Sequence, residues 1–219
     1  MSMVKDLFDK YRYLKYYVAS ISYLFVSLVL GLFLSNGLVI FLGWNILLAT
    51  LVIVLTQVII YSVEHQKSHF WFVVSVIGWV LFFPNTFYIL TDFIHFQAYT
   101  FFDIYPDIYA FHVSDWLVFG HIVIGALYGM KLGIVAIDSL IIYLKKYRFM
   151  LLSLLFLASS FGIYLGRFIR LNSWDIFRVD LLLDAVFHDV SFMLIFVALF
   201  YVIHMISYML FGKKYSIKN

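Results

Sequence analysis

Residues 149–165 read FMLLSLLFLASSFGIYL, and residues 166–175, which follow them, read GRFIRLNSWD. The first stretch has no charged side chain, and a helix that crosses the hydrocarbon core of a bilayer needs about 20 mostly apolar residues. The pattern therefore predicts a membrane-spanning helix over residues 147–170. Two arginines, Arg167 and Arg170, stand where this helix leaves the membrane. Charges at that depth indicate either a function or a buried ion pair.

The whole chain has the composition of a membrane protein. Of its 219 residues, 65% are hydrophobic and 12% are charged, and the mean hydropathy is +1.01, whereas soluble domains carry about 25% charged residues. Cysteine is absent, which excludes disulfides, thiolate metal sites and cysteine nucleophiles. The basic residues gather near the ends of apolar runs rather than in one stripe, so nucleic acid is not an expected partner.

Six apolar runs of spanning length predict an all-α fold, a polytopic membrane helix bundle that forms a single membrane domain over residues 1–219. The stretch 96–112 is too polar and broken to span, and it predicts a short outer loop, with a partly re-entrant path as an alternative. The predicted spans cover residues 16–35, 38–62, 69–95, 113–137, 147–170 and 186–211.

The distribution of Lys and Arg among the connections predicts the orientation. All 15 of these residues except Arg167, Arg170 and Arg178 fall on one side of a six-span arrangement. That side is predicted to be the cytoplasm, so both the basic, aromatic N-terminal segment 1–15 and the tail 212–219 are expected to be cytoplasmic. Arg167 and Arg170 then lie towards the outer face, against the charge bias.

A polar stripe begins beside Pro84 in the motif FPNTFYILTDFIHF, residues 83–96. Proline lacks an N–H and restricts the residue before it, so a kink or a new helix start is expected there. A stripe of this kind is expected to face the bundle or a wet cavity rather than lipid. Hydrogen-bonded packing is the alternative to a functional role. The stripe collects four side chains on one helical face: Asn85, Tyr88, Asp92 and His95.

The arginine pair precedes a second helix start. Asn172 or Ser173 suits an N-cap, and Asp175 suits a helix N-terminus, which predicts an interfacial helix on the outer face. Guanidinium groups bind phosphate or carboxylate through two parallel hydrogen bonds. One interpretation is therefore an anion clamp; the other is an internal salt-bridge network with Asp92, Asp115 or Asp189. The candidate substrate-binding residues are Arg167, Arg170, Asn85, Asn172, Trp174 and Asp175.

Three Asp/His pairs have helical spacing at one predicted depth: Asp92 with His95, His112 with Asp115, and Asp184 with His188. Carboxylate and neutral imidazole suit Zn²⁺ or another divalent first-row metal, and the candidate ligands are Asp92, His95, Asp184, His188 and Asp189. The same pairs equally suit proton transfer, with the carboxylate orienting the imidazole. The candidate catalytic residues are then Asp92, His95, Tyr88 and His188. Interfacial histidines capped by aspartate, with no metal, are a third interpretation.

Three motifs together resemble a bacterial membrane family, domain of unknown function 1361: GWN at 43–45, FPNTFYILTDFIH at 83–95 and GIYLGRFIRLNSWD at 162–175. The resemblance covers about residues 40–190 and departs at Phe87 and Phe96, where the family often has Pro and Leu. It implies a multi-pass protein of the bacterial cytoplasmic membrane and brings no activity. The residues that match the family pattern are Asn45, Pro84, Asn85, Tyr88, Thr91, Asp92, His95, Gly162, Tyr164, Gly166, Arg167, Arg170, Asn172, Ser173, Trp174 and Asp175.

Three functions are consistent with these motifs. The first is a membrane-embedded enzyme, a hydrolase or transferase acting at the extracytoplasmic face on a lipid or lipid-linked phosphate. The second is a binder or translocator of an anionic lipid or small anion, and the third is a structural or assembly subunit. The mixture of carboxylate, imidazole and guanidinium at one depth favours the enzyme. Membrane lipid is the expected partner, and the sequence indicates no particular protein partner.

Overall fold

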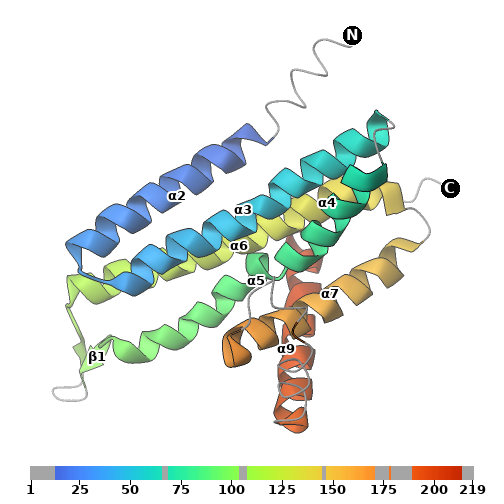
Figure 1. Cartoon of the computed structure of the whole chain (residues 1–219). Helices are drawn as coiled ribbons and strands as arrows, with labels where there is room; N and C mark the ends of the chain where they lie inside the picture. Colours follow the sequence, from blue (N-terminus) through green and yellow to red (C-terminus); the bar gives the residue numbers. More distant parts are fainter. Residues whose placement is uncertain are drawn as a thin grey trace.

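The computed structural model describes residues 13–65, 69–103, 108–144, 147–170, 178 and 189–213. Within these residues, six helical segments are long and apolar enough to cross a membrane, which confirms the predicted all-α bundle (Figure 1). The predicted interfacial helix falls outside the described residues. The spans are Leu14–Phe33 (α2), Gly37–Glu64 (α3), His69–Ala98 (α4, α5 and η1), Val113–Tyr143 (within α6, Val113–Leu144), Arg148–Ile169 (α7 and η3) and Val190–Phe211 (α9).

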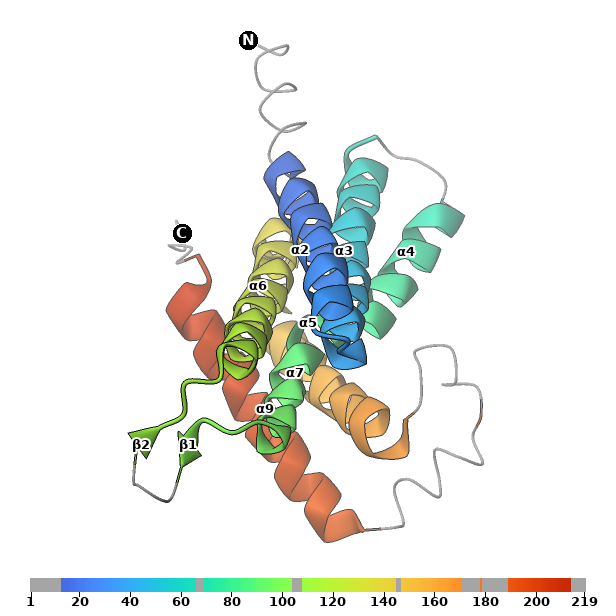
Figure 2. The ribbon, with the colours of Figure 1, turned by 90° about the vertical axis from the view of Figure 1, so that its left-hand side faces the viewer.

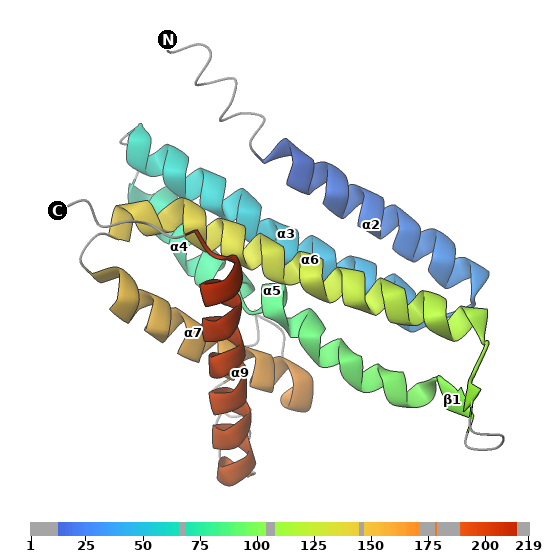
Figure 3. The same cartoon turned by 180° about the vertical axis from the view of Figure 1, so that it is seen from behind.

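Helices α3 and α6 form the centre of the bundle. Ile46 and Ile53 of α3 and Ile122 and Leu132 of α6 have no exposed surface, as expected for apolar side chains enclosed by neighbouring helices. Helix α2 lies against α3 and α6, and α4 lies on the opposite side of α3 (Figure 2). Helix α9 crosses α6 at a steep angle and packs mainly against α7 (Figure 3).

The third span is broken at Pro84, as the sequence predicted. Helix α4 ends at Phe82, and a single turn, α5 (Asn85–Tyr88), restarts the chain before the 3₁₀ segment η1 (Ile89–Ala98). The break frees backbone carbonyls that lipid cannot satisfy. Asn85 satisfies one of these carbonyls, because its side-chain Nδ2 donates a hydrogen bond to the Phe82 carbonyl oxygen at 3.0 Å. The polar stripe therefore lies on α5 and η1, beyond the break.

Two glycines of α6 let the broken span approach closely. A Cβ on Gly129 would lie 2.9 Å from the Thr86 carbonyl oxygen, and one on Gly133 would lie 3.0 Å from the Thr86 Cβ. Both contacts are with Thr86 of α5, so a larger residue at either glycine would push α5 away from α6. Small residues at such crossings are typical of packed membrane helices. This pair fixes the depth of α5 and, through it, the position of η1.

Hydrogen bonds between side chains join the outer helices to the centre. Ser20 of α2 lies 2.7 Å from Thr50 of α3, and Ser27 lies 2.9 Å from Nε2 of His121 in α6. On the other side, His204 of α9 is fully buried and bonds Ser159 of α7 through Nε2 at 2.9 Å. Polar groups of this kind act as interhelical contacts within a membrane, which gives these histidines a packing role.

The predicted outer loop contains a small hairpin that the sequence did not suggest. Strands β1 (Phe102–Asp103) and β2 (Ile108–Tyr109) pair antiparallel, with Phe102 opposite Tyr109. The hairpin connects η1 to the start of α6 and lies at the same end of the bundle as the α2–α3 turn (Figure 1). That end is the predicted outer side.

Candidate functional site

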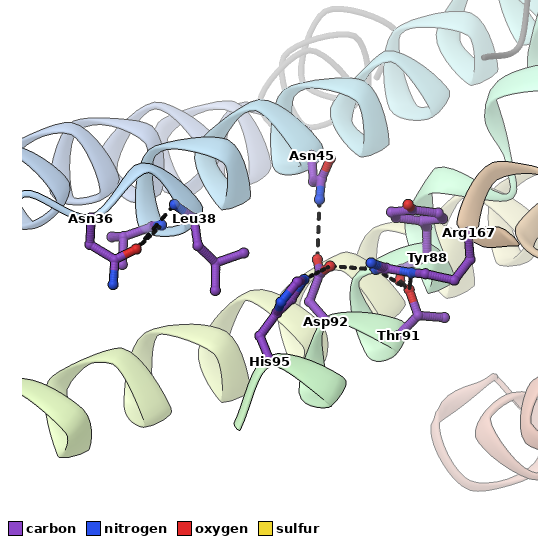
Figure 4. Close-up of polar contacts among 9 residues, drawn as sticks. Asn36, Leu38, Asn45, Tyr88, Thr91, Asp92, His95 and Arg167 are labelled. Carbon is purple, nitrogen blue, oxygen red and sulfur yellow. Dashed lines mark hydrogen bonds and ion pairs between the residues drawn. The ribbon is translucent and has the colours of Figure 1, made fainter. Parts of the chain in front are cut away.

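Asp92 is the centre of a buried polar network at the Arg167 end of the bundle. Its side chain is 1% exposed, and its Oδ1 lies 2.5 Å from Nη2 of Arg167. Its second oxygen, Oδ2, accepts from Nδ2 of Asn45 at 3.1 Å. Figure 4 shows Asn45 reaching down from α3 and Arg167 approaching from the side. Both carboxylate oxygens are therefore bonded, and the network joins three spans through α3, η1 and η3.

Arg167 is held on three sides. Besides the ion pair, its Nε donates to Oγ1 of Thr91 at 2.8 Å, and Nη2 donates to the same oxygen. Its guanidinium carbon lies 4.6 Å from the centre of the Tyr88 ring, a cation–π distance. Thr91 in turn donates to the Tyr88 carbonyl. Of the two sequence-based alternatives, the internal ion pair describes Arg167.

His95 borders this network and is accessible. Its Nε2 lies 3.8 Å from Oδ1 of Asp92, and 39% of its side chain is exposed. The imidazole thus has a carboxylate on one side and is partly exposed on the other, which suits an acid or base beside a carboxylate. The second predicted pair also forms, with His112 Nδ1 3.5 Å from Asp115 Oδ2, but His112 does not line the cavity described next.

A cavity of about 930 Å³ lies beside the network, with α3 on one wall, α7 and η3 on the other, and α4, α5 and η1 between them. We call it the lateral cavity, because several of its wall residues are also exposed on the apolar surface of the bundle, among them Trp44 at 51% and Val80 at 41%. The polar lining residues gather at one end: Asn45, Asn85, Tyr88, His95, Gln97, Arg167 and Arg170. The lining away from that end is apolar: Leu48, Val80, Leu81, Ala158 and Phe161.

Arg170 lines the polar end of the cavity, which we call its mouth, and has unusual backbone geometry. The α-helix α7 (Arg148–Tyr164) passes into a π-helical turn, η3 (Leu165–Ile169), and Arg170 follows with φ 59° and ψ 30°. Left-handed geometry is costly for a residue other than glycine and persists where the surroundings impose it, often at functional sites. Arg170 is exposed, and no aspartate or glutamate among the described residues forms an ion pair with it.

The described residues do not form a cation site around Asp92. Both of its oxygens are already bonded, and Arg167 places a positive charge where a metal would have to sit. No group of three His, Asp or Glu side chains close enough to hold a metal occurs among the described ranges. Asp189 caps α9, since its Oδ1 accepts from the Phe192 N–H at 2.9 Å. Asp184 and His188, the other predicted ligands, lie outside the described residues.

The structure brings together the polar stripe, Arg167 and Arg170, and adds residues that the sequence did not single out. Asn172, Trp174 and Asp175 lie outside the described residues, so their assignment stays a prediction. The cavity walls were missed because Phe41, Trp44, Ala158 and Phe168 look like any lipid-facing residue. A signal did exist for Asn45, which with Gln57 is one of two amides in an otherwise apolar span; it bonds across helices to Asp92.

Comparison with known proteins gives one match. Neither the curated proteins nor the solved structures compared contain a match to this chain. A family model matches residues 44–211, well over half of the chain. The matched region includes the polar stripe, both arginines and every described residue that lines the lateral cavity except Phe41. The chain therefore belongs to the family described as protein of unknown function (DUF1361).

Proposed function

We propose that this membrane protein takes a lipid or lipid-linked phosphate from the outer leaflet into the lateral cavity and acts on it as a hydrolase or transferase. One observation carries the proposal: the polar side chains that line the cavity lie toward its Arg170 end, and the lining beyond them is apolar. Ala158 lies in α7 and Arg170 follows the π-turn η3 twelve residues later, so along the helix axis they lie at most about 18 Å apart at 1.5 Å per residue. That is roughly half of a hydrocarbon core about 30 Å thick. The lining thus has the polarity and depth of one leaflet.

Each polar residue of the mouth has a proposed role. Arg170 binds the phosphate, because its guanidinium has no acidic partner in the described ranges and suits a phosphate with two parallel bonds. Arg167 is bonded to Asp92 and is proposed to hold η1 against η3 while adding positive potential. His95, oriented by Asp92, is proposed to exchange a proton with the bound ester. Asn85 and Gln97 supply amide groups at the same mouth.

Binding or translocation without chemistry is the second candidate. It is favoured by the ion pair between Arg167 and Asp92. Of the two arginines that line the cavity, only Arg170 is then without an acidic partner among the described residues, and so only Arg170 is left to stabilise a developing charge. The two candidates share the binding site and differ in product. Phosphate release from a bound lipid phosphate would support the enzyme, whereas saturable binding or flux in liposomes with no product would support the binder.

The first test concerns the side of the membrane. Because the chain has no cysteine, single cysteines can be labelled specifically. Tyr109, in the hairpin, and His65, at the other end of α3, are both exposed. A membrane-impermeant maleimide is expected to label the Tyr109→Cys variant in intact cells and the His65→Cys variant only after permeabilisation. The reverse pattern would place the mouth of the cavity on the cytoplasmic side and contradict the outer-leaflet assignment.

The second test concerns the anion. Replacing Arg170 with glutamine is expected to weaken the binding of dodecyl phosphate about 10- to 100-fold, because hydrogen bonds to charged groups contribute about 1.5–3 kcal/mol. Binding is measured by native mass spectrometry of the detergent-solubilised protein. Arg148→Gln is the matched control, since Arg148 begins the same helix at its opposite end. Equal affinities of the two variants would contradict the role of Arg170, and equal binding of inorganic phosphate would contradict a lipid ligand.

A further inference from the structure

The lateral cavity has a defined inner end, at the level of Ala158. On each of its three walls the innermost lining residues are Leu48 of α3, Val80 of α4 and Ala158 of α7. One turn further inward on α3, Val52 has no exposed surface and belongs to the packed core. Among the described residues, none inward of these three lines the cavity. On the α3 wall, a chain that enters from the mouth therefore meets packed protein one turn beyond Leu48.

The wall formed by α7 and η3 includes three small residues at four-residue spacing, Ala158, Gly162 and Gly166, beside larger apolar ones such as Phe161 and Leu165. Gly162 is required by packing, because a Cβ there would lie 2.9 Å from Cγ of Pro84. Ala158 is different: it is exposed, and its side chain faces the inner part of the cavity. Volume can be added at Ala158 without moving the backbone at Pro84, so this residue controls how much of the inner cavity is free.

From this geometry we infer that the lateral cavity accommodates one hydrocarbon chain of a lipid phosphate and that Ala158 sets the longest chain accepted. This inference rests on the proposed function and adds the specificity for the tail. The volume of about 930 Å³ lies within the range of about 300–1,000 Å³ usual for a site that holds one ligand. Arg170 at the mouth positions one phosphate, and the distance from there to Ala158 fixes the length of chain that fits below it.

The cavity is expected to discriminate between alkyl chains by length, because its lining is as apolar as the surrounding lipid. A methylene gains little when it moves from lipid into an apolar cavity, because lipid tails are as apolar as the side chains. Chains that fit are therefore expected to bind with similar affinity from a lipid phase. A chain longer than the cavity has to bend or displace packed side chains, which is unfavourable. Binding should then fall beyond one chain length rather than rise steadily.

The experiment uses an equimolar mixture of decyl, dodecyl, tetradecyl and hexadecyl phosphate in neutral detergent micelles, with occupancy by chain length read by native mass spectrometry. Ala158→Phe is expected to lower the hexadecyl-to-decyl occupancy ratio by roughly tenfold relative to wild type, the size of an overpacking effect. The occupancy by decyl phosphate should be unchanged. Leu157→Phe is the control, since Leu157 is 50% exposed and does not line the cavity.

The outcomes separate this inference from the function on which it rests. If Ala158→Phe and Leu157→Phe both keep the wild-type ratio while decyl phosphate still binds, Ala158 does not set the chain length and the proposed binding site stands. If no alkyl phosphate binds wild type more tightly than the Arg170→Gln variant, the proposed function itself fails. Should Ala158→Phe not fold, Ala158→Leu is read instead, with the same ratio expected to shift in the same direction by a smaller factor.

Discussion

Replacing Asp92 with alanine is expected to lower the free energy of unfolding by about 3–5 kcal/mol, the usual cost of removing one partner of a buried ion pair. The carboxylate is 1% exposed and bonds both Arg167 and Asn45. Without it, a guanidinium that is 16% exposed and an amide donor lose their acceptor inside the bundle. Unfolding in mixed micelles, followed by circular dichroism, measures the change.

Two further variants show whether the charge pair itself is responsible. Asp115→Ala removes an aspartate from the other formed Asp/His pair, in which His112 is 56% exposed, and the expected loss is about 1 kcal/mol or less. The double variant Asp92→Leu with Arg167→Met removes both charges and is expected to recover most of the loss, because apolar replacements of a buried pair are often neutral. A double variant no more stable than Asp92→Ala would contradict this account of the network.

The spans and the polar stripe could be predicted from the sequence because each depends on local chemistry. Apolar runs of about 20 residues have few alternatives to a membrane helix. Pro84 interrupts the third span in any packing arrangement, because proline has no N–H to donate to the helical hydrogen bond. Spacing placed Tyr88, Asp92 and His95 on one face, and the structure keeps these side chains together although η1 is a 3₁₀ rather than an α-helix. A polar face on an apolar helix has only the bundle interior in which to lie.

The different contacts of Arg167 and Arg170 could not be predicted from the sequence. Both are arginines three residues apart at the end of one span, and a regular helix would put them on the same face. The structure separates them through the π-turn η3 and the left-handed backbone of Arg170, neither of which has a sequence signature here. Both arginines line the cavity, but Arg167 is paired with Asp92, whereas Arg170 has no acidic partner among the described residues. The residues of the cavity walls could not be identified from the sequence either, because residues that face a lipid ligand have the same composition as residues that face bulk lipid.

His95 is the residue on which the choice between enzyme and binder depends. In the proposed hydrolysis, water attacks the phosphorus of a lipid phosphate, the bond from phosphorus to the alkyl oxygen breaks, and the products are an alcohol and inorganic phosphate. The leaving oxygen needs a proton, and His95 is the proposed donor, with Asp92 3.8 Å from the imidazole. Tyr88 also lines the cavity, with its ring against the Arg167 guanidinium, and stays the second candidate for this role. Binding alone would need the arginine and no proton donor.

Replacing His95 with glutamine is therefore expected to lower the rate of phosphate release from dodecyl phosphate in proteoliposomes by about 10²–10⁴-fold, the range for loss of a general acid or base. Binding of the same lipid by native mass spectrometry should change less than about threefold, since Arg170 carries the charge recognition. His112→Gln is the matched control: it also removes a histidine paired with an aspartate, but one outside the cavity. Equal loss in both variants would contradict a proton-transfer role. Binding by wild type without any phosphate release would favour the binder, and with it a purely electrostatic role for the Asp92–His95 pair.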